Sequence, residues 1–254
     1  MCPVKTKAVE AATGLERAPT GIDELDRILN GGIPCGNTTL VTGACGTGKT
    51  TLAAEFLMNG AKKGDRGMLL AVTETRKKLV ENLSTFKFFD RKFIDNEDVV
   101  IVEVADIYKK LGLEDKEFAS KDVASLVTGI MEIAQQHDIS RLVIDSVTGI
   151  NFRLGSKDNI RDFTFRLSKQ MSDAGITGIL ISEVSPGTKD YSTHGVEEAI
   201  ADGVIVLGNI EQRGYLLRTL HVVKMRGTTH SRAKYVMDLS TYGIILVPML
   251  RSPA

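Results

Sequence analysis

A run of eight residues near the amino-terminal end carries the residue types of a phosphate site. The run is Gly43-Ala44-Cys45-Gly46-Thr47-Gly48-Lys49-Thr50, called the glycine-rich loop below. Its glycines let backbone N–H groups turn inward around a polyphosphate, at a helix start whose dipole favours negative charge. Lys49 would reach the β- and γ-phosphates, and the Thr50 hydroxyl would ligate magnesium. The spacing therefore predicts a polyphosphate site that uses Mg²⁺.

The segments on either side of the glycine-rich loop support this interpretation. The apolar stretch from Thr38 to Thr42 predicts a strand before the loop, and the stretch from Thr51 to Leu57 predicts a helix after it. An ordinary glycine-rich turn is the alternative, but a chance match does not usually have a strand before it and a helix after it. We therefore expect residues 43–51 to contact the phosphates.

Two carboxylates follow predicted strands and are expected at the same sheet edge as the glycine-rich loop. Asp145 ends the apolar run Leu142 to Ile144, and a second acidic position of this kind holds magnesium in phosphoryl-transfer sites. Glu74 follows the predicted strand 67–72, where it could act as the general base for an attacking water. The alternative for Glu74 is a solvated carboxylate that caps the helix beginning near Thr75. The spacing leaves both interpretations of Glu74 open.

A second group of cations lies far along the chain. The basic segment is Lys224-Met225-Arg226-Gly227-Thr228-Thr229-His230. On a strand, Lys224 and Arg226 would point to one face. Two cations and an imidazole at one exposed edge suit an anion, and a terminal phosphate is the obvious candidate. The alternative is a solvated basic turn.

Apolar strands alternate with amphipathic helices over most of the chain. The predicted strands span residues 38–42, 67–72, 99–102, 141–145, 177–182 and 203–207. Such alternation requires crossover connections, so it predicts an α/β fold with a mostly parallel sheet covered by helices on both faces. The stretches 215–224, 234–239 and 243–247 follow short turns and predict antiparallel strands at one edge of the sheet.

The length indicates one domain, and the balanced charge excludes a net positive field that would attract nucleic acid. With 254 residues and 43% apolar content, the chain can bury a full core as one unit. We expect residues 1–13 to be a flexible lead-in and residues 14–254 to form a single domain. Lys plus Arg equals Asp plus Glu at 32 each, so binding to nucleic acid or to an anionic membrane would have to be local.

The cysteines and the apolar stretches point to a cytoplasmic protein. Cys2, Cys35 and Cys45 are an odd number without metal-type spacing, so we expect free thiols. No apolar stretch has the length of a membrane span, and the start lacks a signal-peptide core. For Cys45, a redox switch and a small residue tolerated among backbone ligands are the two interpretations, and we favour the second.

Together these motifs resemble the KaiC-type branch of the RecA/RadA ATPase superfamily, from about Thr20 to Val247. Besides the glycine-rich loop and the basic segment, the resemblance rests on Gly21-Ile22-Asp23-Glu24-Leu25-Asp26 with Gly31-Gly32-Ile33-Pro34, on Ile144-Asp145-Ser146-Val147-Thr148, and on Gly195-Val196-Glu197-Glu198-Ala199-Ile200-Ala201-Asp202. It implies a RecA-like P-loop NTPase core with ATP and Mg²⁺ as ligands.

The resemblance also implies an assembly. In this family, the segment similar to the basic segment reaches across a ring interface to the neighbour's nucleotide. A hexameric ring of identical subunits is therefore expected, with Lys224, Arg226 and His230 on the neighbour's γ-phosphate and Thr228 beside them. Thr85 matches a family position that lines the base pocket. A protein partner of unknown identity would respond to the state of the ring.

Two departures from the family pattern shape the expected function. Family members often carry paired glutamates after the second strand, whereas this chain has Thr73-Glu74. If the missing first carboxylate is the working base, hydrolysis is slow or lost. The circadian clock protein has two such domains and phosphorylates itself in the second, so for this one-domain chain we predict neither clock nor autokinase activity.

These motifs are compatible with three functions. The leading one is a slowly hydrolysing, ring-forming regulatory ATPase. The second is a DNA-dependent ATPase of the recombinase type, which would hold DNA on the loops Gly149–Asn159 and Pro186–His194. These loops carry few cations, namely Arg153, Lys157 and Lys189, which makes DNA binding less favourable. A non-hydrolysing ATP sensor acting as an assembly scaffold is the third, and Thr73 supports it.

Overall fold

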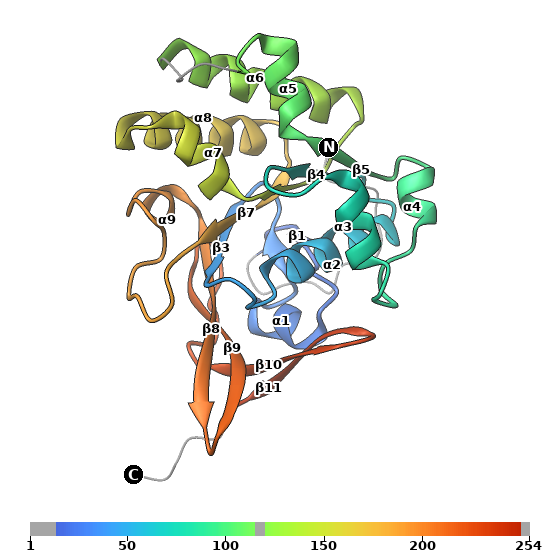
Figure 1. The fold of residues 1–254 in the computed structure, drawn as a ribbon. Coiled ribbons are helices and arrows are strands. Elements are labelled where there is room, and N and C mark those ends of the chain that lie inside the picture. The colour runs from blue at the N-terminus through green and yellow to red at the C-terminus, as the bar shows by residue number, and fades with distance from the viewer. Residues whose placement is uncertain (1–13, 115–119, 250–254) are drawn as a thin grey trace.

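A single large sheet organises the computed structural model, which describes residues 14–114 and 120–249. Its nine strands follow the order β11-β10-β9-β8-β3-β7-β6-β4-β5. Neighbours from β8 to β5 pair in parallel, and β8 to β11 pair antiparallel. Helices cover both faces, as Figure 1 shows. The predicted α/β class, with its antiparallel extension, is confirmed; the predicted lead-in, 1–13, lies outside the described residues.

The strands begin close to where the apolar runs predicted them. The parallel strands are β3 (Thr38–Gly43), β4 (Gly67–Ala71), β5 (Val99–Glu103), β6 (Arg141–Asp145), β7 (Thr177–Glu183) and β8 (Gly203–Gln212). The antiparallel strands are β9 (Tyr215–Met225), β10 (Tyr235–Ser240) and β11 (Gly243–Pro248). A separate two-stranded pair joins β1 (Arg17–Ala18) to β2 (Ile33–Pro34). Strand β8 extends past its predicted end because its last residues pair with β9 as an exposed ribbon.

Two hydrophobic cores hold the helices against the sheet. One core packs α1 (Asp23–Ile28), α2 (Lys49–Ala61), α3 (Arg76–Leu83) and α4 (Lys92–Asp95). The other packs α5 (Val104–Leu111), α6 (Ser120–Gln136), α7 (Val147–Leu154), α8 (Lys157–Asp173) and α9 (Glu197–Ile200). Within β4, Leu69 faces the first core and Leu70 the second, since successive strand residues point to opposite faces. Each fully buried leucine contributes roughly 1.5–3 kcal/mol.

The prediction of a loop over Gly149–Asn159 is wrong. Helix α7 occupies residues up to Leu154, Gly155 ends it with a φ of 71°, and α8 begins at Lys157. Its Ile150 and Leu154 are buried in the second core, and that apolar spacing indicates a helix. Arg153 donates to the carbonyl oxygens of Leu113 and Glu114. The second predicted loop, Pro186–His194, is irregular in the structure.

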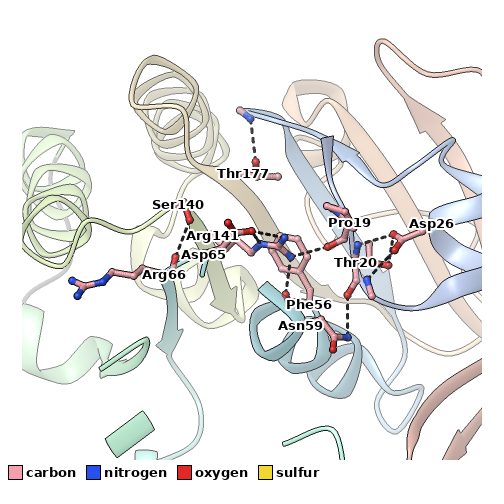
Figure 2. Close-up of polar contacts among 12 residues, drawn as sticks. Pro19, Thr20, Asp26, Phe56, Asn59, Asp65, Arg66, Ser140, Arg141 and Thr177 are labelled. Carbon is pink, nitrogen blue, oxygen red and sulfur yellow. Dashed lines mark hydrogen bonds and ion pairs between the residues drawn. The ribbon is translucent and has the colours of Figure 1, made fainter. Parts of the chain in front are cut away.

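A buried arginine ties three parts of the first core together (Figure 2). Arg141, on β6, pairs with Asp65 at 2.6 Å and donates to the carbonyl oxygens of Pro19 and Phe56. Its side chain is 1% exposed. A Cβ on Gly60 of α2 would lie 2.5 Å from the Arg141 side chain, so glycine makes room for the guanidinium. The arginine thus joins β6 to α2 and to the segment before α1.

Replacing Arg141 with Met should lower the free energy of unfolding by about 3–5 kcal/mol, because Asp65 would keep a buried charge without its partner. Urea unfolding measures this change. The double replacement Arg141→Met with Asp65→Leu removes both charges and should recover much of the loss. A single-variant loss below about 1 kcal/mol would contradict this view of the pair.

Candidate functional site

The carboxyl ends of the central parallel strands bring the candidate residues together. Gly43 of β3 lies opposite Glu183 of β7, and Asp145 of β6 lies opposite Ala71 of β4. A pocket opens at this edge. It is lined by Cys45, Gly46, Gly48, Lys49, Thr50, Thr51, Thr73, Glu74, Leu79, Asp145, Glu183 and Leu239. Crevices outside the carboxyl ends of parallel strands are where open α/β sheets bind ligands.

The glycine-rich loop connects β3 to α2 without side chains at its tightest points. A Cβ on Gly43 would lie 2.3 Å from the carbonyl oxygen of Leu207, closer than any side chain can approach. Gly48 precedes the first residue of α2 with a φ of 95°, in the left-handed region that favours glycine. The loop therefore presents backbone to the pocket at a helix start, as an anion site requires.

Lys49 is folded back onto the glycine-rich loop. Its Nζ donates to the carbonyl oxygens of Gly43 at 2.9 Å and Ala44 at 2.8 Å. Burial lowers the pKa of the Lys49 ammonium, and the carboxylates of Glu183 and Asp145 oppose that shift. A buried ammonium bonded to neutral carbonyls would gain from an anion placed beside it.

Thr50 and Asp145 meet, as the sequence predicted. The Thr50 hydroxyl donates to Asp145 Oδ2 at 2.6 Å. Burial raises the pKa of Asp145, while the Thr50 hydrogen bond and Lys49 act in the opposite direction. A hydroxyl and a carboxylate are hard oxygen donors, and Mg²⁺ is commonly held by one or two such groups together with phosphate oxygens and water. The donor set therefore fits magnesium.

Glu74 lines the pocket and is not the cap of α3. That cap is Thr75, whose hydroxyl accepts from the backbone N–H of Lys78, so the capping interpretation of Glu74 is wrong. Glu74 Oε2 instead accepts a long bond, 3.4 Å, from Asn82. The carboxylate is partly exposed beside Thr73. This arrangement leaves the carboxylate able to contact a water in the pocket.

Three residues at the site were not singled out from the sequence. Glu183 ends β7 and lines the pocket; its place after a predicted parallel strand was a usable signal. Leu239 of β10 also lines the pocket, and its side chain lies 3.3 Å from where a Gly48 Cβ would stand. Arg218 of β9 donates Nε to the Gly46 carbonyl at 3.1 Å. Both reach the loop through the antiparallel strands, whose order the sequence does not specify.

Thr85 is not among the residues that line the pocket. It follows α3, where its hydroxyl donates to the carbonyl oxygen of Asn82 at 2.8 Å. The structure thus does not bring Thr85 together with the glycine-rich loop.

The basic segment lies at the opposite end of β3 from the glycine-rich loop. The backbone N–H of Arg226 bonds to Asp202, and the N–H of Asp202 bonds to Thr38, the first residue of β3. Gly43, at the other end of that strand, is about 17 Å away, since a strand rises about 3.3 Å per residue. Strand β9 ends at Met225, so the prediction that Lys224 and Arg226 share one strand face is wrong.

The last two candidates in the basic segment contact residues of the same chain. The Thr228 hydroxyl accepts from Arg17 Nη1 at 2.7 Å. His230 Nδ1 lies 3.2 Å from the carbonyl oxygen of Ser231. Both residues are partly exposed, and both lie with Arg226 beyond the end of β9.

A buried carboxylate connects the helix of the glycine-rich loop to the last hairpin. Glu55 of α2 is 5% exposed, and its Oε2 accepts from the backbone N–H of Ile244 at 2.9 Å. A Cβ on Gly243 would lie 2.4 Å from Glu55 Oε1, so the hairpin turn approaches closely only with glycine. Burial raises the pKa of Glu55 to about 7, while the Ile244 bond and Lys62 pull it down.

Stability should therefore fall as the pH rises. The folded-state pKa of about 7 lies above the ordinary glutamate value of 4.5, so the stability that protonated Glu55 contributes is fully present below about pH 4.5 and is lost as the pH rises through about 7. The loss in the free energy of unfolding is at most about 3.5 kcal/mol, at about 1.4 kcal/mol per pKa unit. Glu55→Gln should flatten the dependence in urea unfolding at pH 5 and pH 8. An equal change in the free energy of unfolding between pH 5 and pH 8 in parent and variant would exclude Glu55 as the cause.

Comparisons with known proteins converge on one family. The model of the KaiC ATPase family matches residues 18–251. A UPF0273 protein of Methanopyrus kandleri is 31% identical, over 92% of this chain and 93% of the relative. The crystal structure of a KaiC-like protein from Pyrococcus horikoshii superposes with a TM-score of 0.78 at 33% identity, covering 92% of this chain and all of that one.

The chain is shorter than its clock relatives. The circadian clock oscillator protein KaiC of Parathermosynechococcus lividus is 31% identical over 240 residues, which are 93% of this chain and 43% of that protein. The chain thus spans less than half the length of the curated clock proteins that it matches. In the described residues, no helix has the length and apolar character needed to cross a membrane.

Proposed function

The chain belongs to the KaiC family of ATPases, and we propose that it is a cytoplasmic, ring-forming regulatory ATPase that hydrolyses ATP slowly. Each nucleotide site would be shared between two subunits of a hexamer. One subunit supplies the glycine-rich loop, and its neighbour supplies the basic segment. A protein partner would respond to the nucleotide state of the ring.

The observation that carries this proposal is the separation of the two cationic groups along β3. The basic segment lies about 17 Å from the loop of its own subunit, too far for a side chain to bridge. Within one subunit, Arg226 therefore cannot reach a phosphate held by Lys49. In a closed ring of identical subunits, the head of one subunit contacts the tail of the next. In the proposed ring, this contact would bring the basic segment of one subunit to the glycine-rich loop of the next.

The residues of the pocket divide the chemistry of hydrolysis among them. Backbone N–H groups of residues 43–51 and the Lys49 ammonium would hold the phosphates. Thr50 and Asp145 would hold Mg²⁺, which offsets phosphate charge. Glu74 would orient and deprotonate the attacking water. Arg226, with Lys224 and His230, would stabilise the charge that develops on the γ-phosphate of the neighbour.

A second candidate function is favoured by Thr73. It lines the pocket beside Glu74 at the position where a first glutamate would stand, so only one carboxylate follows β4. A chain that binds ATP without hydrolysing it would act as a sensor and assembly scaffold. The recombinase alternative loses support, because α7 and α8 occupy one of its two predicted DNA-binding loops.

One preparation tests these functions together. We expect native mass spectrometry to show a hexamer in ATP and Mg²⁺, and the same preparation to release phosphate at a rate unaffected by single-stranded DNA. Ring formation without phosphate release would support the sensor. Stimulation by DNA would support the recombinase alternative, and a monomer under all conditions would overturn the proposal.

A further inference from the structure

Arg226 is held by its own subunit through Asp202. Its Nη1 pairs with Asp202 Oδ1 at 2.9 Å and also donates to the carbonyl oxygen of Ile200 at 3.3 Å. Its Nη2 donates to the carbonyl oxygen of Ala199 at 3.4 Å. The guanidinium is thereby fixed against the end of α9 by three acceptors.

Asp202 is itself fixed by the central strand. Its Oδ2 accepts from the backbone N–H of Thr38 at 3.1 Å, and its own N–H donates to the Thr38 carbonyl oxygen at 2.8 Å. The Arg226 N–H then donates to the Asp202 carbonyl oxygen at 2.9 Å. Thr38 is fully buried, and it begins the strand that ends in the glycine-rich loop. The carboxylate therefore connects Arg226 to the buried start of β3.

The held arginine still presents a free edge. Its side chain is 58% exposed, compared with 26% for Asp202. The side-chain bonds described for Arg226 use Nη1 and Nη2, whereas a guanidinium carries five N–H donors. Nε–H and one N–H of Nη2 therefore remain available to an anion. A carboxylate on one edge and an anion on the other would leave the plane of the guanidinium unchanged.

The charge of Asp202 also offsets the repulsion between Arg226 and a second cation, Lys224. Burial and the charge of Arg226 lower the pKa of Lys224, and the carboxylates of Asp202 and Glu198 oppose this. Without Asp202, two like charges would stand side by side with less compensation. Asp202 thus stabilises the charged forms of both Lys224 and Arg226 in the basic segment.

We propose that Asp202 is the positioning residue that holds Arg226 in the orientation needed to contact the neighbour's terminal phosphate. This inference rests on the proposed function. Asp202 does not contact the nucleotide itself. It acts by fixing a long, flexible side chain in advance, so that less side-chain entropy is lost when the phosphate is bound.

Asp202→Asn tests this in the assembled ring, because asparagine can still accept from the Thr38 N–H but lacks the charge that holds Arg226. We expect kcat for ATP to fall on the order of 10-fold, with KM and ring mass unchanged. Asn37→Ala is the matched control, since the Asn37 side chain donates to the backbone carbonyl oxygen of Arg226, at 3.2 Å, and not to its guanidinium. Its kcat should stay within about twofold of the parent, as expected for a weak exposed bond.

A double-mutant cycle separates positioning from a merely structural role. If Asp202 acts through Arg226, then Asp202→Asn should have no further effect on kcat in the Arg226→Ala background. Additive losses, a parental kcat, or a kcat above the parent would overturn the inference; the last would mean that Asp202 withholds the arginine. Should Asp202→Asn not fold, Asp202→Glu gives the same cycle, since the added methylene misplaces the carboxylate.

These experiments also distinguish failure of this inference from failure of the proposed function. If Arg226→Ala rings hydrolyse ATP at the parental rate, the shared site itself is wrong. If Arg226→Ala is impaired and Asp202→Asn is not, only the positioning role of Asp202 is wrong.

Discussion

Replacing Lys49 with Ala is expected to weaken ATP binding by at least about 100-fold, or about 2.7 kcal/mol. The variant loses the buried ammonium that would pair with the β- and γ-phosphates. Because the Lys49 Nζ bonds only to the loop carbonyls of Gly43 and Ala44 in the described structure, its removal should leave the fold intact. Titration calorimetry with ATP and Mg²⁺ measures the change, and a melting curve checks the fold.

The matched control lies at the far end of the same helix. Lys62 is an exposed lysine just after α2 that donates to Asn59 at 3.2 Å. Lys62→Ala removes the same charge from the chain without touching the pocket, so its affinity should equal that of the parent. Unchanged affinity in Lys49→Ala would remove the basis for a phosphate site in the glycine-rich loop.

Glu74→Gln is expected to lower turnover by at least about 100-fold while ATP still binds. Glutamine keeps the size of the side chain and can still accept from Asn82, but it cannot take a proton from water. Phosphate release in single-turnover conditions measures the step directly. Glu81→Gln is the control, because Glu81 is an exposed carboxylate on α3, the helix that follows Glu74.

Two results would count against Glu74 as the base. Parental turnover in Glu74→Gln would exclude it, and the remaining pocket carboxylate, Glu183, would be the next to replace. A parent that binds ATP and never releases phosphate would favour the sensor instead.

The sheet and the loop were predictable because their signals are local. Apolar runs such as Leu142 to Ile144 are buried on both faces, and the spacing of Gly43, Gly48 and Lys49 is confined to a few residues. The meeting of Thr50 with Asp145 followed from one rule, that parallel strands place their carboxyl ends at one edge.

What could not be predicted depends on contacts between distant segments. Helix α7 was missed because Gly149 and the turn residues around Gly155 suggest a loop, whereas burial of Ile150 and Leu154 decides for a helix. The position of the basic segment follows from the pairing of β9 with β8, which places Met225 opposite Gly203. That register exists only once the sheet is assembled, so the distance between the basic segment and Lys49 could not be predicted from sequence.

The most direct test of the shared site is ATP hydrolysis by rings mixed from two impaired variants. Arg226→Ala keeps the glycine-rich loop, and Lys49→Ala keeps the arginine. In an equal mixture, about a quarter of the interfaces pair an intact loop with an intact Arg226, because the two variants assort at random around a ring of head-to-tail interfaces. We predict that each variant alone keeps only a small, measurable residual rate and that mixed hexamers, confirmed by native mass, recover about a quarter of the parental rate. Mixed hexamers that form and stay at the residual rate would contradict a site completed by the neighbouring subunit.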